Sequence, residues 1–172
     1  MKYITSFFIA FILLSGRCFA LETIDCDCSQ MIEYAQKNLP HCGVLKMSNG
    51  FVYVDVDDAY VHDLIGFIQD QGFEEPPYFG QVYSAGAHIS VIYKDETAQY
   101  GIQKIDECGQ KICFTLKSCQ VVHPPTWKEI EEVYVIIVDA PELNRLRKKY
   151  GVPKGYDFHI TIGVKPKVEK AA

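Results

Sequence analysis

The chain has 172 residues, with 17 basic and 22 acidic side chains and a net charge of −5. This length suits one domain of ordinary size. The acidic balance, with no run of Lys or Arg, argues against a protein that grips long nucleic-acid duplexes through many phosphate contacts, although a local site for a short anion is compatible with it.

Residues 1–20 are typical of a secretory signal peptide. Lys2 begins a short basic region, residues 4–14 are almost wholly apolar, and Cys18 and Ala20 place small residues at −3 and −1 of a cleavage site after Ala20. The apolar run is shorter than the ~20 residues that span a membrane. We therefore predict an exported protein, periplasmic or secreted, whose mature chain (residues 21–172) is one domain without a membrane segment.

Six cysteines follow this segment: Cys26, Cys28, Cys42, Cys108, Cys113 and Cys119. An even number in an exported protein predicts disulfides, but the sequence does not choose among the pairings. The alternative is a metal site made from Cys26, Cys28, Cys42 and His41. We disfavour it because structural zinc sites usually show two well-spaced pairs of ligands, and we predict no metal and no cofactor.

The predicted elements of the first half follow from hydrophobic periodicity and from residues that begin and end helices. A helix is predicted near 27–39 and ends at Pro40, and aromatic and β-branched residues predict a strand over 51–56. A helix over 59–71 follows, with Asp57 or Asp58 as its N-cap and Gly72 as its end. After a proline-containing loop at 73–80, a strand is predicted over 87–93.

The second half follows a similar order. A short helix at 97–104 and strands at 111–117 and 120–123 join the halves. A strand is predicted over 133–138, a helix from about 140 to 150 with Pro141 in its first turn, and a strand over 158–164; the tail from Lys165 is expected to fray. Four charged side chains of that helix are predicted to face solvent: Arg145, Arg147, Lys148 and Lys149.

The two halves align with each other. Residues 52–54 and 133–135 both read Val-Tyr-Val, and Asp58-Ala59 aligns with Asp139-Ala140 at the same offset of 81. A strand–helix–loop–strand unit therefore occurs twice, in lobes of about 51–93 and 132–164. Two such lobes related by a pseudo-twofold axis predict a duplicated α+β fold around a central cleft.

Each lobe ends in a similar motif, H-I-S-V at 88–91 and H-I-T-I at 159–162. Residues i and i+2 of a strand face the same way, so His88 shares a face with Ser90, and His159 with Thr161. Two imidazoles supply a general base and a general acid, and two hydroxyls can donate hydrogen bonds to phosphate oxygens. This set suits in-line displacement at phosphorus without a metal ion.

The paired motifs resemble the signature of the 2H phosphoesterase superfamily, over about residues 51–164. The resemblance implies a two-lobed α+β fold and metal-independent hydrolysis of 2',3'-cyclic phosphates or related phosphodiester bonds of RNA and nucleotides. It also implies that His88 and His159 are the acid–base pair and that Ser90 and Thr161 bind the phosphate. The chain is similar to exported bacterial members described as RNA-repair-like. We expect a monomer that acts on a small nucleotide or an RNA end.

Recognition of a base would need aromatic side chains near the motifs. The candidates are Tyr78, Phe79 and Tyr83 before the first motif, Tyr156 before the second, and Trp127; His123 is a further candidate to flank the site. Asp157 shares the face of His159 and is expected to orient it. Two alternatives are a non-catalytic exported module that binds a phosphorylated ligand, and a disulfide-containing protein that binds a partner protein while the motifs are incidental.

Overall fold

A computed structural model describes residues 23–81, 84–125 and 127–167; the predicted signal peptide and the last five residues lie outside this range. The elements follow in the order β1 (Thr23–Cys26), α1 (Ser29–Asn38), β2 (Cys42–Ser48), β3 (Phe51–Asp55), α2 (Ala59–His62), two 3-10 turns η1 (Ile65–Phe67) and η2 (Gln69–Gln71), β4 (His88–Ile92), α3 (Lys94–Gln99), β5 (Lys111–Cys113), β6 (Thr115–Val122), β7 (Ile130–Asp139), α4 (Pro141–Lys149) and β8 (His159–Pro166).

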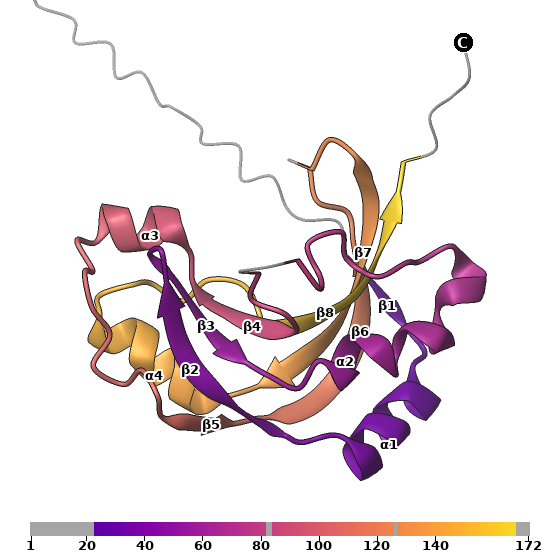
Figure 1. Cartoon of the computed structure of the whole chain (residues 1–172), viewed down its shortest axis with the longest axis horizontal. Helices are drawn as coiled ribbons and strands as arrows, with labels where there is room; N and C mark the ends of the chain where they lie inside the picture. Colours follow the sequence, from indigo (N-terminus) through magenta and orange to yellow (C-terminus); the bar gives the residue numbers. More distant parts are fainter. Residues whose placement is uncertain (1–22, 82–83, 126, 168–172) are drawn as a thin grey trace, which may run out of the picture.

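The strands form one eight-stranded sheet in the order β1-β6-β7-β8-β4-β3-β2-β5, and all neighbouring pairs are antiparallel. The two strands that carry the His motifs, β4 and β8, lie side by side in the middle of the sheet (Figure 1). Each continues outward through two further strands, β3 and β2 on one side and β7 and β6 on the other. The fold is therefore a mixed α/β fold dominated by an antiparallel sheet.

One face of the sheet carries most of the hydrophobic core. The helices α1, α2 and α4 bury apolar side chains in the same cluster as Ile89 of β4 and Ile160 of β8. The helix α2 contacts β8, whereas α4 contacts β4. Each of these two helices thus packs on the motif strand that belongs to the other half of the sequence, and this packing ties the two halves together.

The helix predicted over 59–71 is wrong beyond its first turn. The α-helix ends at His62 and two 3-10 turns follow. A glycine such as Gly66 lowers helix stability by about 1 kcal/mol. In addition, the side chains of Ile65 and Ile68 lie over β8, within 2.8 and 3.1 Å of where a Cβ on Gly163 would be. Packing of these two residues on the sheet outweighs the helical pattern of the sequence.

Other predicted elements shift rather than disappear. The strand expected at 111–117 is divided at Phe114 between β5 and β6, and the strand at 120–123 is the end of β6. The strands β1 and β2 were not predicted. The prediction that the chain frays from residue 165 is wrong for residues 165 and 166. The strand β8 extends to Pro166, and the Lys165 ammonium lies 3.2 Å from the Glu132 carboxylate.

Two disulfides join segments far apart in the chain. Cys28, before α1, is bonded to Cys119 of β6, and Cys42 of β2 to Cys113 of β5. Closing loops of 91 and 71 residues stabilises the fold by about 4–5 kcal/mol each in the chain-entropy account. Because Cys28 and Cys42 are each bonded elsewhere, the alternative metal site is wrong. Disulfides are typical of proteins in an oxidising compartment.

None of the helices in the described residues is long and apolar enough to cross a membrane.

Candidate active site

The pairing of β4 with β8 brings the two His motifs together. The strands pair at Ile89 and Ile160, both fully buried in the core. The residues on either side of this pair point to the opposite face of the sheet. At this antiparallel register His88 lies beside Thr161, and Ser90 beside His159. We call this surface the histidine face. His88 and His159 are therefore diagonal neighbours on the two strands, about 7–8 Å apart.

Both histidines are held by the same local hydrogen bond. The Nδ1 atom of His88 lies 2.8 Å from the carbonyl oxygen of Gly86, and Nδ1 of His159 lies 3.0 Å from that of Asp157. A carbonyl oxygen only accepts, so each Nδ1 donates its hydrogen. In each neutral imidazole Nε2 is then the unprotonated nitrogen, able to take a proton from a ligand. The carboxylate of Asp157, predicted to orient His159, is replaced in this role by the backbone carbonyl of the same residue.

The carbonyl that holds His88 depends on an unusual turn at Gly86. Gly86 has φ of +63°, a left-handed conformation that favours glycine. Next to it, the backbone N–H of Ala87 donates to the Asp58 carboxylate at 2.8 Å. A Cβ on Gly86 would lie 2.6 Å from the same Asp58 oxygen. The turn therefore needs a residue without a side chain, and Asp58, which follows β3, fixes the turn in place.

We expect Gly86→Ala to lower stability more than a glycine substitution at the same φ elsewhere. The left-handed conformation costs about 1–2 kcal/mol for a residue with a Cβ. Displacing Asp58 would leave the Ala87 N–H unsatisfied, at a further cost of about 1–3 kcal/mol. Urea unfolding measures the loss of stability, and nitrogen NMR of the His88 ring reports whether Nδ1 keeps its hydrogen bond to the carbonyl of residue 86.

Gly101→Ala is the matched control, because Gly101 has φ of +64° and nothing within 4 Å of its would-be Cβ. Equal losses of stability in the two variants would show that the contact with Asp58 does not matter.

Burial lowers the pKa of both motif histidines. For His88 this effect is the largest, and it is partly opposed by the hydrogen bond to Gly86 and by the charge of Asp55. For His159 burial is again the largest cause; the hydrogen bond to Asp157 opposes it, and the nearby charge of a protonated His88 lowers the pKa further. The two imidazoles therefore influence each other electrostatically and are both neutral near pH 7.

Aromatic rings surround the histidines. Phe51 and Tyr53 of β3 lie edge-on to His88, with ring centroids 5.5 and 5.9 Å away, and Tyr78 lies 6.0 Å from it. Tyr156 lies 6.3 Å from His159 and 5.5 Å from Tyr93. Of this set, only Tyr78 and Tyr156 were candidates from the sequence. Phe51, Tyr53 and Tyr93 were missed, although the i, i+2 spacing of the first two already places them on one face of a strand.

The remaining sequence candidates lie in different surroundings. Phe79 packs edge-on against His62, with centroids 4.8 Å apart. His123 interacts through Nδ1 with the backbone carbonyl of Glu131 at 3.3 Å. Trp127 is 41% exposed. Tyr83 lies outside the described residues. The structure thus gathers His88, Ser90, His159, Thr161, Tyr78 and Tyr156 around the histidine face, and it shows other contacts for Phe79 and His123.

A buried arginine connects the loops that border the site. Arg147 of α4 is 3% exposed, so the prediction that it faces solvent is wrong. Its guanidinium binds the carboxylate of Glu96 in a bidentate manner, at 2.6 and 3.0 Å, and donates to the carbonyl of Pro153 at 2.8 and 3.1 Å. Glu96 in turn accepts from the backbone N–H of Tyr93 at 2.9 Å. One side chain therefore fixes both Tyr93 and the loop that leads to Tyr156.

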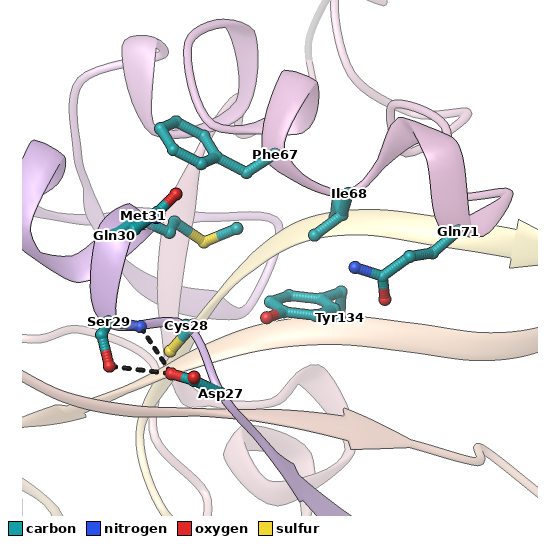
Figure 2. A pocket seen from close by; sticks show the side chains of 9 residues that line it. All are labelled: Asp27, Cys28, Ser29, Gln30, Met31, Phe67, Ile68, Gln71 and Tyr134. Carbon is teal, nitrogen blue, oxygen red and sulfur yellow. Dashed lines mark hydrogen bonds between the residues drawn. The ribbon is translucent and has the colours of Figure 1, made fainter.

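A separate pocket of about 280 Å³ lies beside the start of α1. Figure 2 shows its lining: Asp27, Cys28, Ser29, Gln30, Met31, Phe67, Ile68, Gln71 and Tyr134. Val135 of β7 pairs with Thr161 and so shares the histidine face. Tyr134, the residue before it on the same strand, points to the opposite face of the sheet. The pocket is therefore on the opposite side of the sheet from the histidine face.

Among the described residues, no group of three or more His, Cys, Asp or Glu side chains is placed to hold a metal ion.

The arrangement has the parts that a phosphoryl-transfer site needs. Two neutral imidazoles present a proton-accepting nitrogen, and two hydroxyls stand beside them on neighbouring strands. A family model, the "Swiss Army Knife, 2H phosphoesterase domain", matches residues 52–169 of this chain. Searches of curated proteins and of solved structures gave no significant match. The matched range contains both motif strands, and the chain belongs to the 2H phosphoesterase family, whose chemistry is the hydrolysis of phosphodiester bonds.

Proposed function

We propose that this protein is a metal-independent phosphoesterase that hydrolyses 2',3'-cyclic phosphates or related phosphodiester bonds of nucleotides and RNA ends. The observation that carries the proposal is the matched pair of histidines. Each donates Nδ1–H to a backbone carbonyl two residues earlier and so keeps Nε2 for proton transfer. Side chains that pack on this site are aromatic, which suits a substrate with a base.

The proposed reaction uses one histidine as base and the other as acid. One Nε2 takes a proton from water while the water oxygen attacks phosphorus. The other imidazole, in its protonated form, gives a proton to the ribose oxygen that leaves. One P–O bond forms, one P–O bond of the ring breaks, and the single product is a nucleotide that carries a phosphomonoester on one ribose oxygen and a free hydroxyl on the other. Ser90 and Thr161 donate hydrogen bonds to the non-bridging oxygens as negative charge builds up there.

We further propose that the two halves are a duplicated pair. The sheet order β6-β7-β8-β4-β3-β2 supports this. On each side of the centre, the motif strand (β8 or β4) is followed outward by the two strands that precede it in the sequence (β7 and β6, or β3 and β2). An exported location is also proposed, with removal of residues 1–20; the two disulfides support it. A monomeric state stays a prediction.

The test is an assay of the oxidised chain from residue 21 with 2',3'-cyclic nucleotides and short RNAs that end in a cyclic phosphate, with EDTA present. We expect hydrolysis to a monoester at the same rate with and without the chelator. Activity that EDTA abolishes and zinc restores would contradict the metal-independent mechanism.

The pH dependence of kcat/KM is expected to be bell-shaped, with its maximum on the acid side of about pH 6.5, the usual histidine pKa. The base must be neutral, so activity falls as pH drops below its pKa. The acid must be protonated, so activity also falls as pH rises above its pKa. Both pKa values are lowered by burial, and both limbs move to lower pH. A maximum above pH 7 would contradict this assignment.

A further inference from the structure

The two motif histidines have different partners on the strands beside them. On one side, Asp55 of β3 lies directly opposite His88 of β4. On the other side, Ile137 of β7 lies directly opposite His159 of β8. Directly opposite side chains share one face of the sheet, with Cβ atoms about 4.5–5.5 Å apart. His88 therefore has a carboxylate beside it, whereas His159 has the side chain of a buried isoleucine.

A lysine holds the carboxylate of Asp55. Lys46 of β2 lies opposite Tyr53 in the register of β2 with β3 and so shares the histidine face (Figure 1). Its ammonium is 2.5 Å from the carboxylate of Asp55. Because β2 and β4 flank β3 on opposite sides, the lysine approaches Asp55 from the side away from His88. It fixes the carboxylate and offsets part of its charge without removing the carboxylate from the neighbourhood of the imidazole.

Other ionisable side chains also lie close to His88. The carboxylate of Asp58 binds the backbone N–H of Ala87, in the turn before the strand. The ring of Tyr78 lies 6.0 Å from that of His88, and burial raises the pKa of this phenol, so that it stays uncharged. Tyr53 contributes its ring. Among the described carboxylates, Asp55 is the one whose charge acts on the pKa of His88, and it raises that pKa.

The charges around the two imidazoles favour protonation of His88 over protonation of His159. Burial lowers the pKa of both, and a hydrogen bond to a backbone carbonyl opposes this effect for each. In addition, the charge of Asp55 raises the pKa of His88, whereas a protonated His88 lowers the pKa of His159. The carboxylate of Asp157 acts on His159 in the opposite direction, but it is the smallest influence on that pKa, and Asp157 is exposed to water.

We propose that Asp55 is a positioning residue whose carboxylate, held by Lys46, stabilises the protonated form of His88 and thereby makes His88 the general acid and His159 the general base. This inference rests on the proposed function. His159 takes the proton from the attacking water, and His88 gives its proton to the ribose oxygen whose bond to phosphorus breaks. The step leaves His88 neutral and His159 protonated, and exchange of these protons with solvent restores the starting state.

The test follows the ring nitrogens of both histidines by NMR across a pH titration, beside the pH profile of kcat/KM for a 2',3'-cyclic nucleotide. In the wild type, His88 should titrate at higher pH than His159. In Asp55→Asn, the midpoint of His88 should move to lower pH. A charge of opposite sign at about 4–6 Å favours the ionised form by at least tenfold, and Lys46 offsets part of that effect. We therefore expect kcat/KM to fall by about three- to tenfold on the alkaline limb, with the acid limb little changed.

Lys46→Met should act in the opposite direction. Without the ammonium, the full charge of Asp55 acts on His88, so the His88 midpoint and the alkaline limb should both move to higher pH. The two side chains are 48% and 34% exposed, and pairs of this kind contribute little to stability, so both variants should fold. A purely structural role of the pair would instead produce similar losses of activity in both variants and leave the midpoints in place.

Asp63→Asn is the matched control, because it removes the same charge at the end of α2, where the carboxylate accepts from the Tyr34 hydroxyl. Its pH profile and both midpoints should equal those of the wild type. The inference is overturned if Asp55→Asn leaves the His88 midpoint unchanged, or if it displaces the acid limb of the profile instead of the alkaline limb.

The titration also separates this inference from the proposed function, since it needs no substrate. If the wild-type protein hydrolyses neither cyclic nucleotides nor RNA ends, the proposed function fails, and a lowered His88 midpoint in Asp55→Asn still supports the action of Asp55 on His88. If the wild-type protein is active and Asp55→Asn does not move that midpoint, only the role of Asp55 fails.

Discussion

His88→Ala and His159→Ala are each expected to lower kcat for a 2',3'-cyclic nucleotide by at least about 10²–10⁴-fold, the usual contribution of a positioned acid or base. Each imidazole performs one of two proton transfers on which the same step depends. For that reason the double variant should be little worse than either single variant, because groups that act as a unit are not additive.

The structure supplies a matched control for these variants. His62 lies on α2, interacts with Glu75 at 3.0 Å and contacts Phe79. His62→Ala should keep its activity within about twofold of wild type, since this side chain takes no part in the proposed proton transfers. If His88→Ala and His159→Ala turn over as fast as His62→Ala, the motifs are incidental, and the two-histidine mechanism is wrong.

Arg147→Met is expected to lower the free energy of unfolding by about 3–5 kcal/mol, the usual cost of breaking a buried ion pair by removing one partner. The Arg147 side chain is 4% exposed and that of Glu96 20% exposed, so the remaining carboxylate loses its partner in a place that water reaches poorly. The carbonyl of Pro153 loses its donors at the same time. Urea denaturation measures the difference.

Lys149→Met is the matched control on the same helix. Lys149 pairs with Glu107, but its side chain is 52% exposed, and exposed pairs contribute about 0–1 kcal/mol. Arg147→Lys should recover only part of the loss, because an ammonium cannot bind the carboxylate in a bidentate manner. Equal stability of Arg147→Met and Lys149→Met would show that the buried pair does not hold the fold together.

The pair of Arg147 and Glu96 also makes the free energy of unfolding depend on pH, in a direction that follows from the pKa of Glu96. Burial opposes ionisation of Glu96, but the hydrogen bonds from Arg147 and Tyr93 outweigh it and lower the pKa of Glu96 below its usual value. The ionised Glu96 therefore contributes its full stabilisation above the usual glutamate pKa, and this stabilisation is lost as the pH falls through the lowered pKa of the folded state. The stability difference between wild type and Arg147→Met should shrink in acid.

The two motif strands could be predicted because the sequence pattern that specifies each of them lies within a few consecutive residues. Alternation in H-I-S-V and H-I-T-I predicts two strands with the polar residues on one face, and both strands form. The helix α4 was also predictable, from Pro141 at its start and Gly151 after its end. The position of Arg147 could have been recognised too, because it lies four residues after the buried Leu143 and so on the apolar face of the helix.

Other features depend on contacts between distant segments and leave no local pattern. The 3-10 turns after α2 form because Ile65 and Ile68 pack on Gly163, almost a hundred residues later. The edge strand β1 exists through its pairing with β6. A backbone carbonyl as the group that orients each histidine was equally invisible, since every residue has one.

The most direct measurement of the central claim is phosphorus NMR of a 2',3'-cyclic nucleotide incubated with oxidised protein in EDTA, beside His88→Ala and His159→Ala. The two-histidine account predicts that the cyclic phosphate signal converts to one monoester with wild-type protein and persists with both variants. No conversion by folded wild-type protein, or equal conversion by all three proteins, would contradict it.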